Sequence, residues 1–580
     1  MSKRVAEIVV DTLQNAGVRR CYGIVGDTLN HVTDALHRSE IEWVHVRHEE
    51  VAAFAAGADS LVSGELTACA GSCGPGSLHF INGVFESNRN RAPMVLIASQ
   101  VVTSELGMEF PQEVDFKAVY ASCSVFCEQV HSPEQARRVV TLACQAAISR
   151  RGVAVVILPA DISEAEVKHD VPFSVHYTQP VLRPSDAELQ RIAELLGQGR
   201  RIGIYAGAGC QGAHAQLLEL ARRLQAPIAH TSRAKDFVEP DNPYNMGMTG
   251  IFGIESGFHT LMACDTLLLL GTDFPYRQFY PTGAKIIQVD IRGEHIGRRA
   301  RVDVALVGSV KDTLTQLGST LRQHTDTHHL DASRGTYART RAQLDSLATG
   351  DRNRTPVLPE FLTRRIDALS ADDAVFIADV GTPVIWAARY LTMNGHRRLL
   401  GSFNHGSMAN AVPQAIGAQA SHPGRQVVTL SGDGGLSMML GDLLTLTQSE
   451  LPVKMIVFNN GALSFVEIEM KAAGIVNFGT GLDNPVFADV AQAMGIHADR
   501  VERPSEIDGA LSAAFAHPGP ALVEVLTARQ ELSIPPTINA AQVAGFSLWA
   551  TKTLLSGRGD ELIDLAKTNL GARLHRRKPQ

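Results

Sequence analysis

The sequence predicts an α/β protein with three doubly wound parallel-sheet domains and a C-terminal amphipathic extension. Short apolar runs alternate with helical patterns along the chain, and strands of this kind belong to parallel sheets covered on both faces. The 580 residues are 45% hydrophobic and include 50 glycines, which is enough apolar material for several cores. Strands are expected at 95–98, 153–158, 201–206, 266–270, 285–289, 427–430, 453–458 and 521–525.

Helix and linker signals divide the chain into domains. Residues 1–18 have charges inside an apolar pattern and predict an amphipathic helix, not a signal peptide. Ser185-Asp-Ala-Glu188 is a capping box that opens a helix after a proline-containing linker at 161–186. A polar stretch at 322–359, which includes the histidine-rich segment 324–329, is expected to be a solvated linker. We therefore predict domains at 1–180, 181–333 and 334–530, and a separate C-terminal region at 531–580.

The net charge of −7 hides an uneven distribution along the chain. An acidic protein is a poor candidate for general nucleic-acid binding, and no nucleic-acid partner is expected. The last 16 residues are basic, which leaves −12 on the residues before them. The eight cysteines form no Cys-x-x-Cys pair and predict free thiols in the cytoplasm, and the apolar runs are too short to span a bilayer. The basic residues of the tail are Lys567, Arg573, Arg576, Arg577 and Lys578.

The strongest local motif lies in the third domain. An apolar strand runs into Gly432-Asp433-Gly434, and after 24 further residues a second strand runs into Asn459-Asn460. The glycine loop lets the backbone approach a diphosphate, while the Asp433 carboxylate and the Asn460 amide oxygen are ligands that Mg²⁺ prefers. Each half alone would suit an ordinary turn, but the spaced pair after two strands predicts a magnesium-diphosphate site.

This spaced motif resembles the signature of thiamine-diphosphate enzymes. The resemblance implies that Glu49, in Arg47-His48-Glu49-Glu50, hydrogen-bonds the aminopyrimidine of the cofactor and promotes its imino tautomer, which deprotonates the thiazolium C2. It also implies that Met408 props the cofactor in its bent conformer. By residue type alone, Glu49 would suit a solvated helix start, and Met408 would suit core filling. The thiamine-diphosphate residues implied are Glu49, Gly406, Ser407, Met408, Asp433, Gly434, Gly435, Asn460, Gly461, Ala462, Leu463, Ser464, Phe465 and Val466, with Asp433 and Asn460 on Mg²⁺.

The middle domain contains a Gly-x-Gly-x-x-Gly string at 207–212. A site for NAD would need an acidic residue about 20 residues later, and the sequence has none there. The segments 247–253, 271–277 and 289–291 look instead like the FAD-binding domain of the flavin-containing branch of the family. That branch includes acetolactate synthase, so FAD alone does not establish redox chemistry. The implied FAD residues are Thr249, Gly250, Ile251, Phe252, Thr272, Asp273, Phe274, Pro275, Tyr276 and Asp290.

Over residues 5–570 the chain resembles bacterial pyruvate dehydrogenase (quinone), the pyruvate oxidase group. The strings that carry this resemblance are RHEEVAAFAAGA, CAGSCGPG, GMTG, FPYR, DVGTP, GSFNHGSMANA and LAKTN. It implies pyrimidine-binding, FAD-binding and diphosphate-binding domains, an active site between chains and a homotetramer. The implied reaction decarboxylates pyruvate on thiamine diphosphate, passes two electrons to FAD and then to ubiquinone, and releases acetate.

Three positions qualify this resemblance. Gln112 matches a residue near the substrate, but Pro111 stands where the family has an aromatic. Phe465 matches an aromatic that moves into the active site on activation, although a core phenylalanine on an amphipathic helix is an equal interpretation. At the adenosine end of the flavin, Arg292 replaces the asparagine of the family.

The C-terminal tail is expected to bind membranes. Residues 561–570 read as a short amphipathic helix followed by cations, which suits the surface of an anionic phospholipid leaflet. By sequence alone a helix docked on the body is the alternative, and the resemblance favours the lipid-activated anchor. The expected location is the cytoplasmic side of the inner membrane, with a soluble inactive form. Two other hypotheses stay open: an acetolactate synthase-type carboligase with structural FAD, and a catalytically silent cofactor-binding protein, against which the intact Glu49, Asp433 and Asn460 argue.

Overall fold

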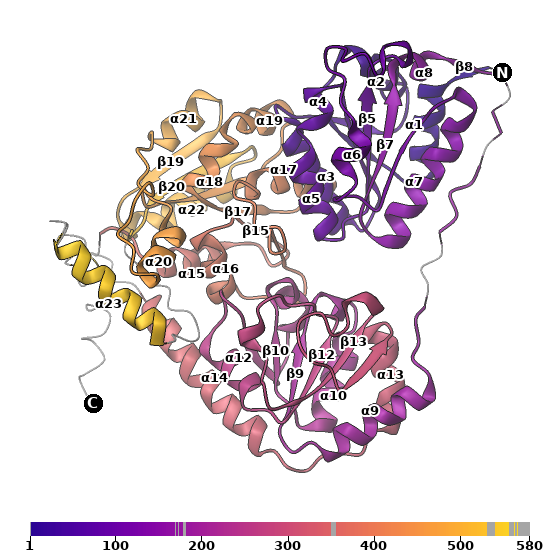
Figure 1. Ribbon diagram of the computed structural model, residues 1–580. Helices are drawn as coiled ribbons and strands as arrows, with labels where there is room; N and C mark the ends of the chain where they lie inside the picture. The colour runs from indigo at the N-terminus through magenta and orange to yellow at the C-terminus, as the bar shows by residue number, and fades with distance from the viewer. Residues whose placement is uncertain are drawn as a thin grey trace.

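The computed structural model describes residues 2–168, 170–171, 173–177, 181–349, 355–529 and 540–555, together with 562 and 565. Three six-stranded parallel sheets, each covered by helices on both faces, follow one another along the chain (Figure 1). The predicted fold class is therefore confirmed. No helix among these residues is long and apolar enough to cross a membrane.

The first domain has the strand order β3-β2-β4-β5-β7-β6. A small antiparallel pair, β1 (Lys3–Arg4) with β8 (Glu166–Val167), ties the start of the chain to the end of this domain. The strands are β2 (Arg20–Gly23), β3 (Glu42–His45), β4 (Thr67–Gly71), β5 (Met94–Gln100), β6 (Phe126–Gln129) and β7 (Val153–Pro159). The helices are α1 (Val5–Asn15), α2 (Asn30–His37), α3 (Glu49–Ser63), α4 (Pro75–Leu78), α5 (Ile81–Arg89), α6 (Phe116–Tyr120), α7 (Ala136–Arg150) and α8 (Ala160–Glu164).

The middle domain has the order β11-β10-β9-β12-β13-β14, so the strand order reverses between β9 and β12 at the centre of the sheet. Its first helix begins where the capping box predicts, with the Ser185 hydroxyl accepting from the Glu188 N–H. The strands are β9 (Ile202–Ala206), β10 (Ile228–His230), β11 (Asn245–Met248), β12 (Thr266–Leu270), β13 (Lys285–Asp290) and β14 (Val304–Val307). The helices are α9 (Asp186–Gln198), α10 (His214–Leu224), α11 (Lys235–Val238), α12 (Glu255–Met262) and α13 (Val310–Thr320).

The third domain has the order β16-β15-β17-β18-β20-β19. Its strands are β15 (Val375–Ala378), β16 (Arg398–Gly401), β17 (Val427–Gly432), β18 (Lys454–Asn459), β19 (His497–Val501) and β20 (Ala521–Leu526). Its helices are α15 (Pro359–Leu369), α16 (Thr382–Tyr390), α17 (Ala411–Ser421), α18 (Asp433–Met438), α19 (Leu443–Gln448), α20 (Ser464–Ala472), α21 (Phe487–Ala493) and α22 (Ile507–Ala516).

The second predicted linker contains a long helix. Helix α14 (His328–Leu347) runs from the middle domain towards the third domain, so the predicted boundary after residue 333 falls inside it (Figure 1). His329 is buried, and burial lowers its pKa to about 4. The interpretation of segment 324–329 as solvated was therefore wrong at His329. The stretch is polar because α14 buries only a few of its residues, which weakens the apolar period that marks a helix.

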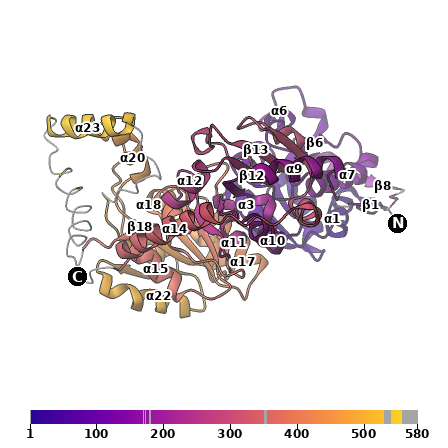
Figure 2. The ribbon, with the colours of Figure 1, turned by 90° about the horizontal axis from the view of Figure 1, so that it is seen from below.

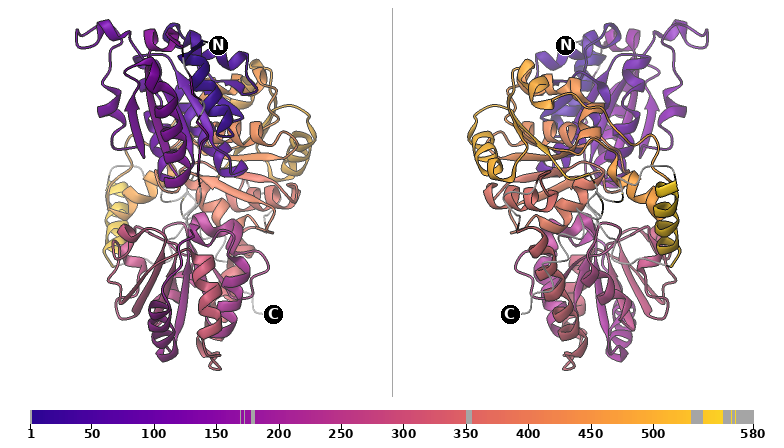
Figure 3. Two further views of the ribbon diagram at one scale, coloured as in Figure 1. Left: turned by 90° about the vertical axis from the view of Figure 1, so that its right-hand side faces the viewer. Right: turned by 90° about the vertical axis from the view of Figure 1, so that its left-hand side faces the viewer.

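The first and third domains are joined by two alanine-rich helices, α3 and α17, which lie side by side (Figures 1 and 3). Gly417 is required at their contact, because a Cβ there would lie 1.8 Å from the carbonyl oxygen of Ala55. One hydrophobic core continues from the first domain into the third across this contact. The two domains therefore form a single packed unit, which fixes the loops that carry the predicted site.

The last described helix, α23 (Ala540–Leu555), packs on α20, as Figure 2 shows from below. A Cβ at Gly545 would lie 2.0 Å from the carbonyl oxygen of Ala472, so the two helices touch through their backbones. The Lys471 ammonium lies 5.1 Å from the centre of the Trp549 ring, a cation–π contact. The predicted membrane-binding segment 561–570 and the basic residues after it lie outside the described residues, apart from positions 562 and 565.

Candidate active site

The two halves of the Gly-Asp-Gly and Asn-Asn motif meet at one edge of the third sheet. Strands β17 and β18 are parallel neighbours, with Gly432 opposite Phe458, so their following loops lie together. Asp433 is buried at the start of α18 and accepts hydrogen bonds from the N–H groups of Gly434 (2.9 Å) and Gly461 (2.8 Å). Burial raises the pKa of Asp433, because removing a carboxylate from water disfavours its charged form.

The turn after β18 is held by two asparagines. Asn460 Oδ1 accepts from the Ala462 N–H at 3.0 Å. Asn484 Nδ2 donates to both Asp433 Oδ2 (2.8 Å) and Asn459 Oδ1 (3.0 Å). Asp433 and Asn460 therefore both accept hydrogen bonds from backbone N–H groups of the turn at 460–462. Asn484 was missed from the sequence, because it lies far beyond the motif and its loop has no distinctive pattern.

Other predicted thiamine-diphosphate residues gather at this loop. A Cβ on Gly434 would lie 2.8 Å from Leu463 and 3.4 Å from the terminal methyl group of Met408, so these side chains border the glycine loop. The hydroxyl of Ser464 is buried and lacks a hydrogen-bond partner among the described residues. A glycine loop, an unpaired buried hydroxyl and a hard oxygen ligand fit a diphosphate-bearing cofactor with Mg²⁺.

The metal prediction depends on oxygens from outside the chain. In the part of the chain that the structure describes, no cluster of three or more His, Cys, Asp or Glu side chains could hold a metal ion. Asp433 supplies one carboxylate and Asn460 one amide oxygen, which is fewer than the six ligands of Mg²⁺. The phosphate oxygens of a bound cofactor and water would have to complete the shell.

Asp379 is a buried carboxyl group that the sequence did not single out as a site residue. Its Oδ1 accepts from the Val380 N–H at 3.0 Å, and the backbones of Ala409, Asn410 and Gly432 also donate to it. Burial nevertheless raises its pKa to about 7. The residue thus ties the ends of β15 and β17 to the loop that carries Met408. Asp379 belongs to the DVGTP string, but the sequence does not indicate that its carboxyl group is buried and accepts hydrogen bonds from these backbone groups.

Glu49 begins α3 in the first domain, beside the Gly74-Pro75-Gly76 turn. Glu49 is 9% exposed as a residue, and its Oε2 lies 3.0 Å from His79 Nδ1. A Cβ on Gly76 would lie 3.5 Å from Glu49 Oε1. Gln112 packs on the same turn, because a Cβ on Gly74 would lie 2.6 Å from its Cβ, and it accepts a hydrogen bond from Cys73 Sγ at 3.3 Å. The structure therefore places Gln112 at the turn that Glu49 faces, while its position near the substrate stays a prediction.

The chain does not join Glu49 to the diphosphate loop. Across the described ranges, its carboxylate forms no hydrogen bond or ion pair with segments 432–435 or 459–464. The loop before α17 does contact the first domain, because Asn82 Nδ2 donates to Ser407 Oγ at 2.9 Å and Asn82 Oδ1 lies 2.7 Å from His405 Nε2. Gly406, with φ +79°, makes the turn before Ser407.

The predicted flavin residues line the carboxyl ends of the middle sheet. Thr249 follows β11, and its hydroxyl is buried without a partner among the described residues. Gly250 has φ +110°, and a Cβ there would lie 2.6 Å from the Phe274 ring. The rings of Phe274 and Tyr276 meet edge to face at 5.4 Å. Ile251 and Phe252 belong to the first of these loops, and Thr272, Asp273 and Pro275 to the second.

Two aspartates of this group have local partners. Asp273 is bound by Arg299 Nε at 3.0 Å and Arg298 at 3.2 Å. Asp290 ends β13, is 7% exposed, and accepts from the Arg292 N–H at 2.9 Å. Burial raises the pKa of Asp290. Of the two, Asp290 accepts fewer hydrogen bonds from the described residues and so has more acceptor positions left for a ligand.

The glycines of the Gly-x-Gly string allow two loops of the middle domain to pack closely. A Cβ at Gly207 would lie 2.5 Å from the carbonyl oxygen of Gly271, and a Cβ at Gly209 would lie 2.7 Å from its Cα. The loops after β9 and β12 therefore touch at the point where the strand order reverses. These glycines are explained by this contact, which agrees with the absence of a NAD acid in the sequence.

A group of arginines beside the flavin loops was also missed. Arg233 follows β10, Arg292 follows β13, and Arg91 and Arg151 come from the first domain. Burial lowers the pKa of Arg233 to about 10, and burial together with the charges of Arg292 and Arg233 lowers the pKa of Arg91 to about 10. Several guanidinium groups held close together favour phosphate oxygens, which fits the diphosphate of a dinucleotide. Their loops are far apart in sequence, so no local pattern marks them.

Phe465 lies in the first turn of α20 and is partly buried against the core of the third domain. Its ring centre is 6.0 Å from that of Phe252 in the middle domain. Gly461, Ala462 and Leu463 form the turn before α20, and Val466 is its third residue. The Phe465 ring thus lies beside one of the segments predicted to bind FAD. Phe252 and Phe465 pack against the same core, so core packing stays an equal interpretation of Phe465.

Three domain families match the chain in order. They are the N-terminal thiamine pyrophosphate (TPP) binding domain (residues 3–119), the central domain (189–317) and the C-terminal TPP binding domain (379–525) of thiamine pyrophosphate enzymes. The chain belongs to the thiamine pyrophosphate enzyme family. In this family, the loops after β17 and β18 fall in the C-terminal TPP binding domain, and Glu49 falls in the N-terminal one.

Similar proteins extend over most of the chain. A putative thiamine pyrophosphate-containing protein, YdaP of Bacillus subtilis, is 31% identical over 98% of this chain and 99% of its own. Pyruvate oxidase of Lactiplantibacillus plantarum is 28% identical over 89% of this chain and 87% of its own. The large subunit of acetolactate synthase isozyme 2 of Escherichia coli is 29% identical over 90% and 95%. These values do not separate an oxidase from a carboligase.

Proposed function

We propose that this protein is a pyruvate dehydrogenase (quinone), which converts pyruvate and water to acetate and CO₂ and passes two electrons through FAD to ubiquinone. The observation that carries the thiamine part is the meeting of Asp433, the turn 460–462 and Met408 around one glycine loop. The oxidative part is supported by the arginine group near Asp290, which fits a dinucleotide, and by the resemblance to pyruvate oxidases.

Five residues of the chain would have the following roles in cofactor and substrate binding. Asp433 and Asn460 would hold Mg²⁺ against the diphosphate, and Glu49 would hold a proton beside the pyrimidine ring. Thiamine diphosphate, once bound, supplies the electron sink for decarboxylation. Gln112 would orient the substrate from the turn at Gly74. Phe465, between the two cofactor segments, would shield the reacting carbon from water.

Because the Glu49 carboxylate forms no hydrogen bond or ion pair with the diphosphate loop among the residues that the structure describes, we propose that a second copy completes the site. A homodimer is then the smallest active unit, and a homotetramer is the proposed assembly. Sedimentation of the loaded enzyme tests this, since a monomer with full activity would contradict it.

Anaerobic addition of pyruvate to the full-length enzyme, loaded with thiamine diphosphate, Mg²⁺ and FAD, tests the reaction. We expect rapid bleaching of the flavin, followed by reoxidation with ubiquinone. Acetolactate without bleaching would establish the carboligase alternative, and no product at all would favour a silent protein. Glu49→Gln should abolish bleaching, whereas the exposed Glu42→Gln of the same domain should retain it.

We further propose that residues 557–580 bind anionic membranes and place the enzyme on the cytoplasmic side of the inner membrane. The support is their sequence, with a short amphipathic pattern and, from residue 565 onwards, five cations and no acid. Deletion of 557–580 should abolish flotation with anionic vesicles and lipid activation of turnover. Unchanged flotation would refute this membrane role.

A further inference from the structure

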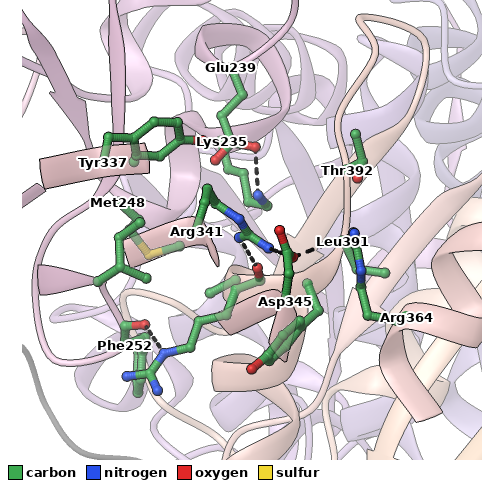
Figure 4. A pocket seen from close by; sticks show the side chains of 15 residues that line it. Lys235, Glu239, Met248, Phe252, Tyr337, Arg341, Asp345, Arg364, Leu391 and Thr392 are labelled. Atoms are coloured by element: carbon green, nitrogen blue, oxygen red, sulfur yellow. Dashed lines mark hydrogen bonds and ion pairs between the residues drawn. The ribbon is translucent and has the colours of Figure 1, made fainter. Parts of the chain in front are cut away.

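A small cavity lies where the middle domain, helix α14 and the third domain meet. Its volume is about 160 Å³, and its walls come from α11, the loop after β11, α14, α15 and α16. Figure 4 shows Lys235 beside Glu239, Arg341 beside Asp345, and Arg364 facing the same space. The cavity is separate from both the diphosphate loop and the arginine group described above.

One buried cation in this wall has too few acceptors. Lys235 is 3% exposed, and its Nζ donates to Glu239 Oε2 at 2.5 Å. Across the described ranges this is its only hydrogen bond, although an ammonium group has three donors. Glu239 also lies 3.0 Å from His230 Nε2, so its carboxylate is shared. Two donor positions of Lys235 therefore remain for another acceptor.

Two further donors of the wall lack hydrogen bonds among the described residues. Arg364 forms ion pairs only at 3.5 Å with Asp345 and 3.6 Å with Asp367. The Tyr337 hydroxyl, on α14, has no partner. Asp345 is already bound by Arg341 at 2.6 Å, so it cannot fully satisfy Arg364.

The charges of the wall point to an anion. Apart from Arg389, which other contacts hold, its cations are Lys235, Arg341 and Arg364, while its acids are Glu239 and Asp345. A positive excess in a cavity with spare N–H and O–H donors favours a compact ligand with several oxygen acceptors. A tetrahedral oxyanion has the right size and can take donors from several directions at once.

The cavity adjoins the two segments expected to carry catalysis. Arg389 donates to the Gly253 carbonyl oxygen at 3.1 Å, which fixes the loop after β11 from the third domain. Phe252 of that loop lines the cavity and contacts Phe465. A ligand that draws α11, α14 and α15 together would therefore restrain this loop and the start of α20.

We propose that this cavity is an effector site for a small dianion of the phosphate class, held by Lys235, Arg364 and Tyr337, and that its occupation restrains loop 249–253 and Phe465. The site does not depend on which reaction the enzyme performs.

Calorimetry with inorganic phosphate, at constant ionic strength and on enzyme saturated with its cofactors, tests the binding. We expect saturable binding at one site per chain and a higher Tm with phosphate. Arg364→Gln should weaken binding by at least about tenfold, and Tyr337→Phe by a smaller factor. Arg365→Gln is the matched control, because Arg365 follows in α15 but pairs with Asp508 outside the cavity at 2.5 Å.

Hydrogen–deuterium exchange tests the coupling without reference to activity. Phosphate should slow exchange in 249–253 and 464–472 of the wild type and Arg365→Gln, but not of Arg364→Gln. Absence of saturable binding, or equal binding by Arg364→Gln and Arg365→Gln, would overturn the site. Binding without slower exchange in these segments would overturn its effector role.

Discussion

Replacement of Gly435 by alanine tests the organisation of the diphosphate loop. Gly435 lies in α18, where alanine would normally stabilise a helix by up to about 1 kcal/mol. Here the new Cβ would lie 1.8 Å from Asp379 Oδ2 and 2.7 Å from its Cγ. Asp379 is short and 1% exposed, and several backbone N–H groups hold it, so it cannot turn away without leaving them unpaired. We therefore expect destabilisation.

The overlap should cost about 3 kcal/mol, at the upper end of the range for overpacked interiors. For a domain of this size that corresponds to a fall in Tm of about 6–12 °C, which differential scanning fluorimetry of the full chain can measure. Gly432→Ala is the matched control, since its Cβ would meet Pro383 at an ordinary 3.8 Å and its backbone is extended. It should change stability by less than about 0.5 kcal/mol.

A double-mutant cycle identifies the cause of the loss. If the clash with the Asp379 side chain is responsible, Gly435→Ala should cost much less when Asp379 is alanine. An equal cost in both backgrounds, or a variant as stable as the wild type, would refute the reasoning.

Three further predictions concern buried or site residues. Burial raises the pKa of Glu86 from 4.5 to about 7, so the folded state binds a proton more tightly than the unfolded state does. The free energy of unfolding should therefore fall by up to about 3 kcal/mol as the pH rises from about 4.5 to 7. Urea unfolding of Glu86→Gln should not show this pH dependence. Parallel pH curves would contradict this. Asp433→Asn should weaken Mg²⁺-dependent binding of thiamine diphosphate at least about tenfold in fluorescence titrations, and affinity within twofold of the wild type would count against the site. Phe465→Leu should lower kcat without changing cofactor affinity; an unchanged kcat with a lower Tm would leave Phe465 as core packing.

The sequence predicted the strands that are runs of large apolar residues and missed those that are short, polar or built of small residues, such as β4 (Thr67–Gly71). The run 266–270 matches β12 (Thr266–Leu270), because all five residues are buried and four are leucine. In contrast, β3 (Glu42–His45) and β11 (Asn245–Met248) are four residues long and contain charged, amide or glycine residues. Such strands are defined by their pairing with neighbouring strands of the sheet. A local sequence pattern carries no information about this pairing.

The residues of the candidate site also fall into those that the sequence could predict and those that it could not. The loop of Asp433 and the turn of Asn460 could be paired from sequence, because parallel strands bring their carboxyl ends together. Asp379, Asn484 and the arginines could not, since each acts through a fold contact with a distant loop. The cavity at Lys235 depends on α14, whose polar sequence had indicated only a linker.

The contact between α3 and α17 has a consequence for synthesis of the protein. Ala55 is translated about 360 residues before Gly417, which must approach its carbonyl oxygen. At about 5–20 residues per second, roughly 20–70 s pass between the synthesis of α3 and the synthesis of α17, which covers the alanine-rich side of α3. During that interval the nascent first domain presents an apolar surface, and a pause or truncation before α17 would leave it open to aggregation or to a chaperone.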